Sequence, residues 1–292
     1  MAIARTTELL TTWEAGLHRS FDGRALLLHQ AARPDTVGDG EALLSLPVGA
    51  READLFALRR DLFGERMQVR LECGACGTDM EFDLDAEEFA RSLPAPDASP
   101  LRIVEDGWAV EFRVPTTADV AVAARHADSR GALLDRCVVS VVRDGEDVRA
   151  GADADAGTGA RAGRGVDAGE RIRAGEGVPA GRGVPVGSDN AVRGTSLTDL
   201  LPTSVQRRIA DAVEAADPAA DVTIAVTCPD CGAATRAELD IASYLWTELD
   251  AWAKELLLDV HLLATAYGWS EPEILALSPL RRRYYLELCA DV

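Results

Sequence analysis

Two Cys-x-x-Cys pairs constrain the fold of this chain more than any other feature of its sequence. Cys73 and Cys76 form the first pair, Cys228 and Cys231 form the second, and a glycine directly follows each pair. A tight turn of this kind presents two thiolates from one loop, and two such turns supply the four sulfur ligands of a tetrahedral zinc ion. The sequence therefore predicts one Zn²⁺ site built from these four cysteines.

The separation of the two pairs shapes the prediction for the rest of the chain. About 150 residues lie between them, whereas a compact zinc ribbon separates its pairs by about 15–20 residues. Each half is too small to close a metal site alone, so we expect the two halves to meet in space. Residues 86–220 would then be an insertion within one domain.

Two other interpretations of the cysteine pairs are less favoured. Disulfides need an oxidising compartment, and residues 1–16 lack the continuous apolar stretch of a secretory signal, so we expect a cytoplasmic protein. A thioredoxin-like redox pair lies at the start of a helix, whereas strands are predicted on both sides of each pair here. Four thiolates leave no open position for water, so the zinc is expected to be structural. Cys137 and Cys289 are interpreted as apolar side chains and not as ligands.

Alternating apolar residues predict β-hairpins at three places in the chain. One hairpin carries the first cysteine pair at its tip, and a strand leads into the second pair. A further hairpin is expected to turn at Asp106-Gly107. The alternating apolar positions are Val69, Leu71, Met80, Phe82, Leu84, Trp108, Val110, Phe112, Val114, Val222, Ile224 and Val226.

Helical spacing of apolar residues predicts the remaining elements. The first helical segment contains Leu9, Leu10, Trp13 and Leu17, and it continues from Arg24 to Arg33. Gly64 is expected to end the helix that precedes the first cysteine pair. The other expected helices cover residues 51–63, 116–137, 196–216 and 240–266.

Residues 151–187 differ in kind from the rest of the chain. They are rich in Gly and Ala, contain no aromatic residue, and repeat a six-residue pattern between Arg161 and Val184. Hexapeptide repeats can build a parallel β-helix, but this stretch is too short to stack several coils around a core. A flexible Gly/Ala-rich insertion over residues 148–195 is the favoured interpretation.

These elements predict an α+β fold, with zinc-ribbon-like β-hairpins, a surrounding helical lobe and a C-terminal three-helix corner. Residues 1–147 would hold the N-terminal helices, the first cysteine pair and the second hairpin. Residues 196–292 would hold the second pair and the C-terminal helices, and both pairs would close one domain. The expected boundaries follow from the composition change at the insertion.

Charge and motifs exclude several classes of function. The formal net charge of −19 repels nucleic acid and anionic lipid, and no apolar run is long enough to span a membrane. The four histidines are scattered, and neither a phosphate-binding loop nor a nucleophile motif is present. We therefore expect a protein that is not an enzyme and has no membrane partner, and nucleic acid is a disfavoured partner.

The C-terminal segment contains several helix stop and start signals. Gly268 is expected to end the long helix, Ser270 and Glu273 form a capping box, and Ser278 with Pro279 begins another helix. The result is a corner of three helices. Its expected packed side chains are Trp269, Ile274, Leu277, Tyr284 and Leu288.

A series of short motifs runs through both halves of the chain in a fixed order. In the N-terminal half they lie at residues 13–16, 24–26, 51–55 and 62–64. In the C-terminal half they are Leu200, Cys228-Pro-Asp-Cys231-Gly, Asp240-Ile-Ala-Ser-Tyr-Leu-Trp246, Asp250-Ala-Trp252, His261-Leu-Leu-Ala264, Tyr267-Gly-Trp-Ser270, Glu273-Ile274, Leu277 and Arg281-Arg-Arg-Tyr-Tyr-Leu-Glu287. The series resembles that of T-even-type phage baseplate hub assembly chaperones, of which longer versions with zinc knuckles occur in gene clusters for phage-like contractile injection systems. Residues 233–235 lack the bulkier side chains expected after the second pair.

The resemblance implies an assembly factor that binds hub or wedge proteins of a contractile baseplate. A permanent structural subunit is one alternative, and a zinc-ribbon regulator that binds nucleic acid or polymerase is another. The C-terminal corner is the expected partner surface. Its expected contact residues are Trp269, Ser270, Ile274, Leu277, Arg281, Arg282 and Tyr285.

Overall fold

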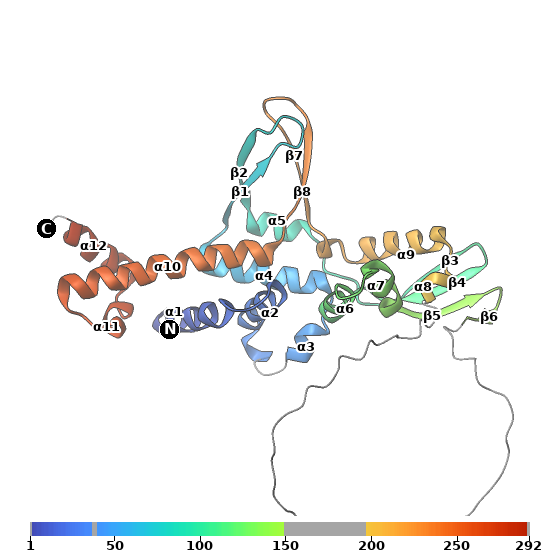
Figure 1. Ribbon diagram of the computed structural model, residues 1–292, viewed down its shortest axis with the longest axis horizontal. Helices are drawn as coiled ribbons and strands as arrows, with labels where there is room; N and C mark the ends of the chain where they lie inside the picture. Colours follow the sequence, from blue (N-terminus) through green and yellow to red (C-terminus); the bar gives the residue numbers. More distant parts are fainter. Residues whose placement is uncertain (1, 37–39, 149–196, 291–292) are drawn as a thin grey trace, which may run out of the picture.

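The computed structural model describes residues 2–36, 40–148 and 197–290. The predicted flexible insertion, including its six-residue repeats, lies almost wholly outside the described residues. The described part is elongated: two hairpins stand on the middle, a small sheet lies at one end, and a helical lobe lies at the other (Figure 1). The fold is α+β, as the sequence predicts. None of its described helices has the length and apolar character needed to cross a membrane.

The central lobe is a helical body drawn from both ends of the chain. Its main core joins residues of the first ninety with residues 222–256. The long C-terminal helix runs through this body, and Leu245 and Leu249 on its predicted stripe are fully buried. Gly64, with a positive φ of 85°, ends the helix before the first hairpin, as predicted. The elements are α1 Ala2–Gly16, α2 Phe21–Ala32, η1 Pro34–Thr36, α3 Gly40–Leu44, α4 Val48–Phe63, α5 Ala86–Ser92, η2 Pro218–Ala220 and α10 Ile241–Tyr267.

The two cysteine-bearing hairpins are separate two-stranded antiparallel sheets that lie side by side above α10 (Figure 1). The predicted alternation is present in the first hairpin. Met67, Val69 and Met80 are buried, while their strand neighbours Gln68, Arg70, Asp79 and Glu81 are exposed. Ile224 on the second hairpin joins the same core as Met67. The strands are β1 Arg66–Glu72, β2 Asp79–Asp85, β7 Thr223–Thr227 and β8 Ala234–Glu238.

The second lobe is a four-stranded sheet in the order β3-β4-β5-β6, with its own core. The predicted turn at Asp106-Gly107 is present, and both residues have positive φ. Val110 and Phe112 from the sheet pack with Ile209 from a helix over it. The elements are β3 Leu101–Glu105, β4 Trp108–Phe112, α6 Thr117–Ala123, α7 Ser129–Cys137, β5 Val138–Arg143, β6 Glu146–Asp147, α8 Leu197–Leu200 and α9 Thr203–Ala216.

Two predicted helices in this lobe are each divided in the structure. The helix expected over residues 116–137 breaks between α6 and α7, because the Asp128 carboxylate accepts the backbone N–H of Gly131 at 3.0 Å and begins a new helix. The helix expected over residues 196–216 breaks at Pro202, which precedes α9. The predictions of single helices were therefore wrong at these two points.

A buried polar contact joins the two lobes. The Asp217 carboxylate, at the end of α9, accepts the backbone N–H of Gly49 in α4 at 2.9 Å. Its other oxygen has no partner among the described atoms, and burial raises the pKa of Asp217. A Cβ atom on Gly49 would lie 1.8 Å from that oxygen. The contact therefore requires glycine on α4.

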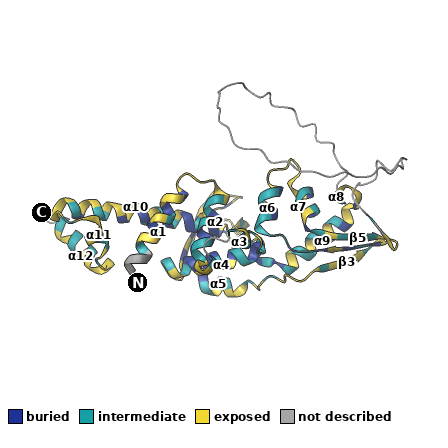
Figure 2. Ribbon diagram, turned by 90° about the horizontal axis from the view of Figure 1, so that it is seen from below, coloured by how far each residue is buried: buried dark blue, intermediate teal, exposed yellow. Residues whose placement is uncertain are grey.

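The terminal lobe consists of the outer half of α10 followed by α11 Glu271–Leu275 and α12 Pro279–Ala290. Gly268 ends α10 in the left-handed conformation, and the predicted capping box of Ser270 and Glu273 is present. One expectation for this corner was wrong. Tyr284 and Leu288 are exposed, so they do not pack with the buried Ile274. Figure 2 shows α12 in the colours of exposed and intermediate residues.

Candidate functional site

Each cysteine pair lies in a tight turn at the tip of its hairpin, and the two turns share one geometry. In the first turn the backbone N–H of Gly77 donates to the carbonyl of Cys73 at 2.8 Å. In the second turn the N–H of Gly232 donates to the carbonyl of Cys228 at 3.0 Å. Both glycines have positive φ, 74° and 73°. This conformation is strained for other residues, which explains a glycine after each pair.

The four cysteine sulfurs converge on one point between the hairpin tips. Their Sγ atoms all lie within 4.8 Å of one another. Cys73 lies 3.7 Å from Cys231, and Cys76 lies 3.7 Å from Cys228. A tetrahedral ion with metal–sulfur distances of ~2.3 Å places neighbouring sulfurs ~3.8 Å apart. The residues present thus fit a four-thiolate metal site, and the sulfurs are too far apart for disulfides, whose S–S bond is ~2.05 Å.

Hydrogen-bond donors around the first turn favour the thiolate form. The backbone N–H groups of Ala75 and Cys76, together with the Thr235 hydroxyl, lower the pKa of Cys73 to about 6. Hydrogen bonds with the side chain and then the backbone of Thr78 lower the pKa of Cys76. Because thiolates are the metal-binding form of cysteine, these donors prepare the first turn for a metal ion.

The sulfur of Cys231 differs from those of the first turn, because its neighbours favour the protonated thiol. At Cys231 the backbone N–H of Ala233 favours the thiolate, but the adjacent sulfurs, that of Cys76 first, outweigh it and raise the pKa of Cys231 to about 12. Four sulfurs this close cannot all carry negative charge unless a cation lies between them. A divalent metal would supply that charge and displace the remaining protons.

Few apolar contacts support the cysteine tips. Cys73 and Cys228 are buried and pack with Met80, while Cys76 and Cys231 are exposed. The Thr78 hydroxyl donates to the Asp230 carboxylate at 2.9 Å and adds one polar contact between the turns. So small an apolar cluster stabilises the tips little by itself, and a metal ion bound by the four sulfurs would join them more firmly.

A buried arginine fixes the base of the first hairpin to the helices. Arg59 on α4 is only 2% exposed. Its guanidinium donates to both carboxylate oxygens of Glu248 on α10, at 2.8 and 2.6 Å. It also donates to the carbonyls of Gly64 and Arg66, both at 2.7 Å. This bidentate pair joins α4, α10 and β1, and no local motif in the sequence reveals it.

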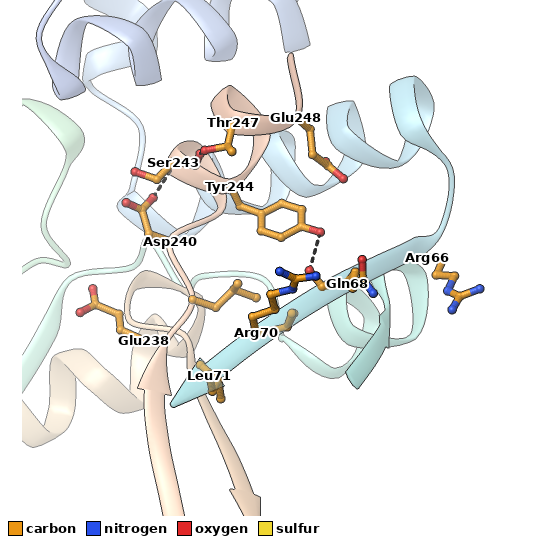
Figure 3. Close-up of a pocket in the computed structure, with 12 residues that line it drawn as sticks. Arg66, Gln68, Arg70, Leu71, Glu238, Asp240, Ser243, Tyr244, Thr247 and Glu248 are labelled. Atoms are coloured by element: carbon orange, nitrogen blue, oxygen red, sulfur yellow. Dashed lines mark hydrogen bonds between the residues drawn. The ribbon is translucent and has the colours of Figure 1, made fainter. Parts of the chain in front are cut away.

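An open groove of about 710 Å³ lies beside this contact, between β1, the end of β8 and the first turns of α10. Figure 3 shows Tyr244 crossing it from α10, and its hydroxyl donates to the carbonyl of Gln68 at 3.1 Å. Arg66 and Arg70 on β1 pair with Asp83 and Glu81 on β2. The Tyr244 contact thus crosses the groove and fixes β1 to α10, while the two ion pairs join β1 to β2.

The structure places the expected partner residues of the terminal lobe in different environments. Ile274 is fully buried and the Arg282 side chain is 13% exposed, paired with Asp259 at 3.1 Å. Both therefore lie inside the lobe and offer little contact surface, which corrects the predicted surface at these two positions. Ser270 is exposed, but it is engaged in its capping box with Glu273.

An aromatic cluster accounts for two further expected contact residues. Trp269 stacks on Tyr267 with ring centroids 4.6 Å apart, and Tyr285 meets Trp269 edge-on at 4.9 Å. Trp269, Tyr285 and Leu277 are all partly buried. Arg281 is exposed, and no ion pair to it is present among the described residues. Of the expected surface, Arg281 is the most accessible charged group.

Comparison with known proteins gives one match. Residues 33–162 match the family model described as T4 bacteriophage base plate protein. The matched stretch includes α4, the first cysteine pair and the strands of the second lobe, and it ends before the second pair. No curated protein and no solved structure matches this chain. The match supports a phage baseplate-related protein.

Proposed function

We propose that this chain is an assembly factor for the baseplate of a phage-type contractile tail or injection system. It works in the cytoplasm and acts by binding other baseplate proteins, namely components of the hub or wedge. The observation that carries the proposal is the match of residues 33–162 to the T4 base plate family. The ordered C-terminal motifs, from the second cysteine pair to α12, support the assembly role.

We also propose that the metal at the hairpin tips is a structural zinc ion held by Cys73, Cys76, Cys228 and Cys231. The sulfur separations support a tetrahedral ion, and an all-thiolate shell is typical of structural zinc. When bound, the ion cross-links two hairpins that are distant in sequence. Cys73 and Cys76 hold it from one side, and Cys228 and Cys231 from the other.

Binding rather than catalysis is the proposed mode of action. The well-ordered polar clusters among the described residues are engaged in holding the fold. Arg59 pairs with Glu248, and the buried Asp119 pairs with Arg113 and Arg136. In these two clusters the carboxylates and guanidinium groups are occupied by one another, so they stabilise the fold.

A permanent structural subunit is the second candidate, and one observation favours it. The description of the matching family names a base plate protein, which suggests a resident component. A regulator that binds nucleic acid has less support, because two of the three consecutive arginines 281–283 on α12 already pair with acids: Arg282 with Asp259, and Arg283 with Glu287. The two baseplate roles differ in whether the chain remains in the finished particle.

The test is a pull-down of the tagged full chain while particles are being produced. Soluble subassemblies and finished, sedimenting particles are analysed separately. An assembly factor is expected with hub or wedge proteins in the soluble fraction and absent from finished particles. Stoichiometric recovery in particles would establish the structural subunit instead. Recovery with no baseplate protein in either fraction would contradict both roles.

A further inference from the structure

Helix α12 carries an apolar stripe on its solvent-facing side. Leu280, Tyr284 and Leu288 follow one another at intervals of four residues and are 65%, 61% and 57% exposed. At ~100° per residue these positions cover an arc of about 80° on one side of the helix, along ~12 Å of its length. Three adjacent exposed apolar side chains form a continuous ridge, unlike single exposed residues such as Val104.

The opposite side of α12 is fixed to the rest of the terminal lobe. Arg282 pairs with Asp259 on α10, and Tyr285 contacts both Tyr267 and Trp269. Turning α12 to bury its apolar ridge would break the ion pair and the aromatic cluster together. The ridge is therefore a stable feature of this lobe, and covering it requires a partner from outside.

The charges around the ridge indicate what kind of partner fits. Arg281 borders it on one side, and Arg283, 78% exposed, borders it on the other. Arg283 shares its charge with Glu287 at 3.0 Å, whereas no described acid pairs with Arg281. With the Arg283–Glu287 pair neutral as a whole, Arg281 leaves a net positive charge beside the ridge in a chain of net charge −19. A complementary surface is apolar at its centre and acidic at the edge that meets Arg281.

We propose that Leu280, Tyr284 and Leu288 form a docking ridge for an acidic amphipathic helix of a partner protein. The inference rests on the proposed function in taking that partner from the baseplate. Side chains four residues apart form the ridges that pack into the grooves of a second helix. Tyr284 is the expected anchor at the centre, because tyrosine is enriched among the residues that dominate binding energy.

The experiment uses the full chain, produced together with the particle. A photoreactive phenylalanine analogue replaces Tyr284, and in a matched control it replaces the exposed Val104 on β3. Cross-linked peptides are identified by mass spectrometry. We expect position 284, and not position 104, to capture a segment with apolar residues at helical spacing and acidic neighbours. Capture of a second copy of this chain, of a basic segment, or of nothing would overturn the proposal.

A second measurement separates this inference from the proposed function. The triple variant Leu280→Ser, Tyr284→Ser, Leu288→Ser should fold, because all three side chains are exposed, and should bind the partner at least about 100-fold more weakly. If the triple variant bound baseplate proteins as tightly as the wild type does, the docking ridge would be contradicted and the proposed function would stand. Capture of an acidic helix from a protein outside the baseplate would leave the ridge standing and contradict the proposed function.

Discussion

The cysteine hairpins and the terminal lobe both project from the central helices, but they are held together in different ways. The hairpin tips contain a small apolar cluster around Cys73, Met80 and Cys228, and four sulfurs occupy their centre. The terminal lobe has the buried Ile274, an aromatic cluster and one ion pair, and it leaves an apolar ridge in solvent. The difference suggests a division: the hairpins hold distant parts of the chain together, and the terminal lobe binds.

The largest expected effect comes from breaking the metal site. Cys73→Ser should abolish metal binding and destabilise the chain by several kcal/mol. Apparent free energies of structural zinc binding are about 10–16 kcal/mol, comparable to the stability of a whole domain. Thermal denaturation of the purified variant measures the loss. Cys289→Ser on α12 is the control and should leave the transition nearly unchanged. A Cys73→Ser protein that is metal-free but as stable as the wild type would contradict the role of the hairpins in holding distant parts of the chain together.

The next effect tests how the hairpins are joined to the helices. Arg59→Ala should cost about 3–5 kcal/mol, because it leaves Glu248 and two backbone carbonyls without their partner. Chemical denaturation gives the free energy of unfolding. Arg66→Ala is the matched control: Arg66 is exposed and pairs only with Asp83 at the surface, so it should cost less than about 1 kcal/mol. Equal costs for the two variants would contradict the role given to Arg59.

Within the terminal lobe, two substitutions compare the stability cost of a change in the buried core with that of a change on the exposed ridge. Ile274→Ala should cost about 2–5 kcal/mol in the stability of the lobe, because Ile274 is fully buried. Leu280→Ala should cost at most about 0.5 kcal/mol, because its side chain lies in solvent. Hydrogen exchange of the α11 and α12 amides measures local stability directly. Equal protection losses would mean that the ridge is part of the packing and not a free surface.

The smallest expected effect concerns pH. Burial raises the pKa of Asp217 and of Glu52 in the main body, so their stabilising contribution is present below the unfolded-state pKa and is lost as pH rises through the folded-state values. Glu273 behaves oppositely: the Ser270 hydroxyl and N–H lower its pKa, and its contribution is lost as pH falls through the lowered value. Asp217→Asn should flatten the decline of stability with rising pH.

Denaturation of wild type and of Asp217→Asn at several pH values between acidic and neutral checks this. The stability advantage of the variant should grow as pH rises, because only the wild type acquires a buried charge. Glu52 still titrates in the variant, so part of the slope should remain. A constant difference between the two proteins at every pH would show that Asp217 keeps an ordinary pKa.

Local patterns explain why the hairpins were predictable. Each cysteine pair with its glycine specifies a turn, and the flanking alternation of apolar residues specifies strands, so both signals lie within about 20 residues. The long helix was equally readable, because Asp240 caps it and Gly268 ends it. The strand β5 was missed although its signal exists: a β-branched run precedes Asp144-Gly145, a turn with positive φ at both residues.

Contacts between distant residues could not be read from local patterns. Arg59 directly follows the buried Leu58 on α4, and its partner Glu248 lies 189 residues further along the sequence. The rotation of α12 was also misjudged. Periodicity gives two apolar faces on this helix, and the contacts of Arg282 with Asp259 and of Tyr285 with Trp269 decide which one turns inward. Hydrophobic spacing alone cannot make that choice.

The proposed division of the molecule depends on one metal ion that joins two hairpins about 150 residues apart. Native mass spectrometry of the full chain, purified from cells without added metal, tests for that ion most directly. We expect a mass that exceeds the apoprotein by one zinc ion, and retention of that ion until the thiolates are protonated in acid. A chain at its metal-free mass, with its cysteines reduced or joined in disulfides, would contradict the claim.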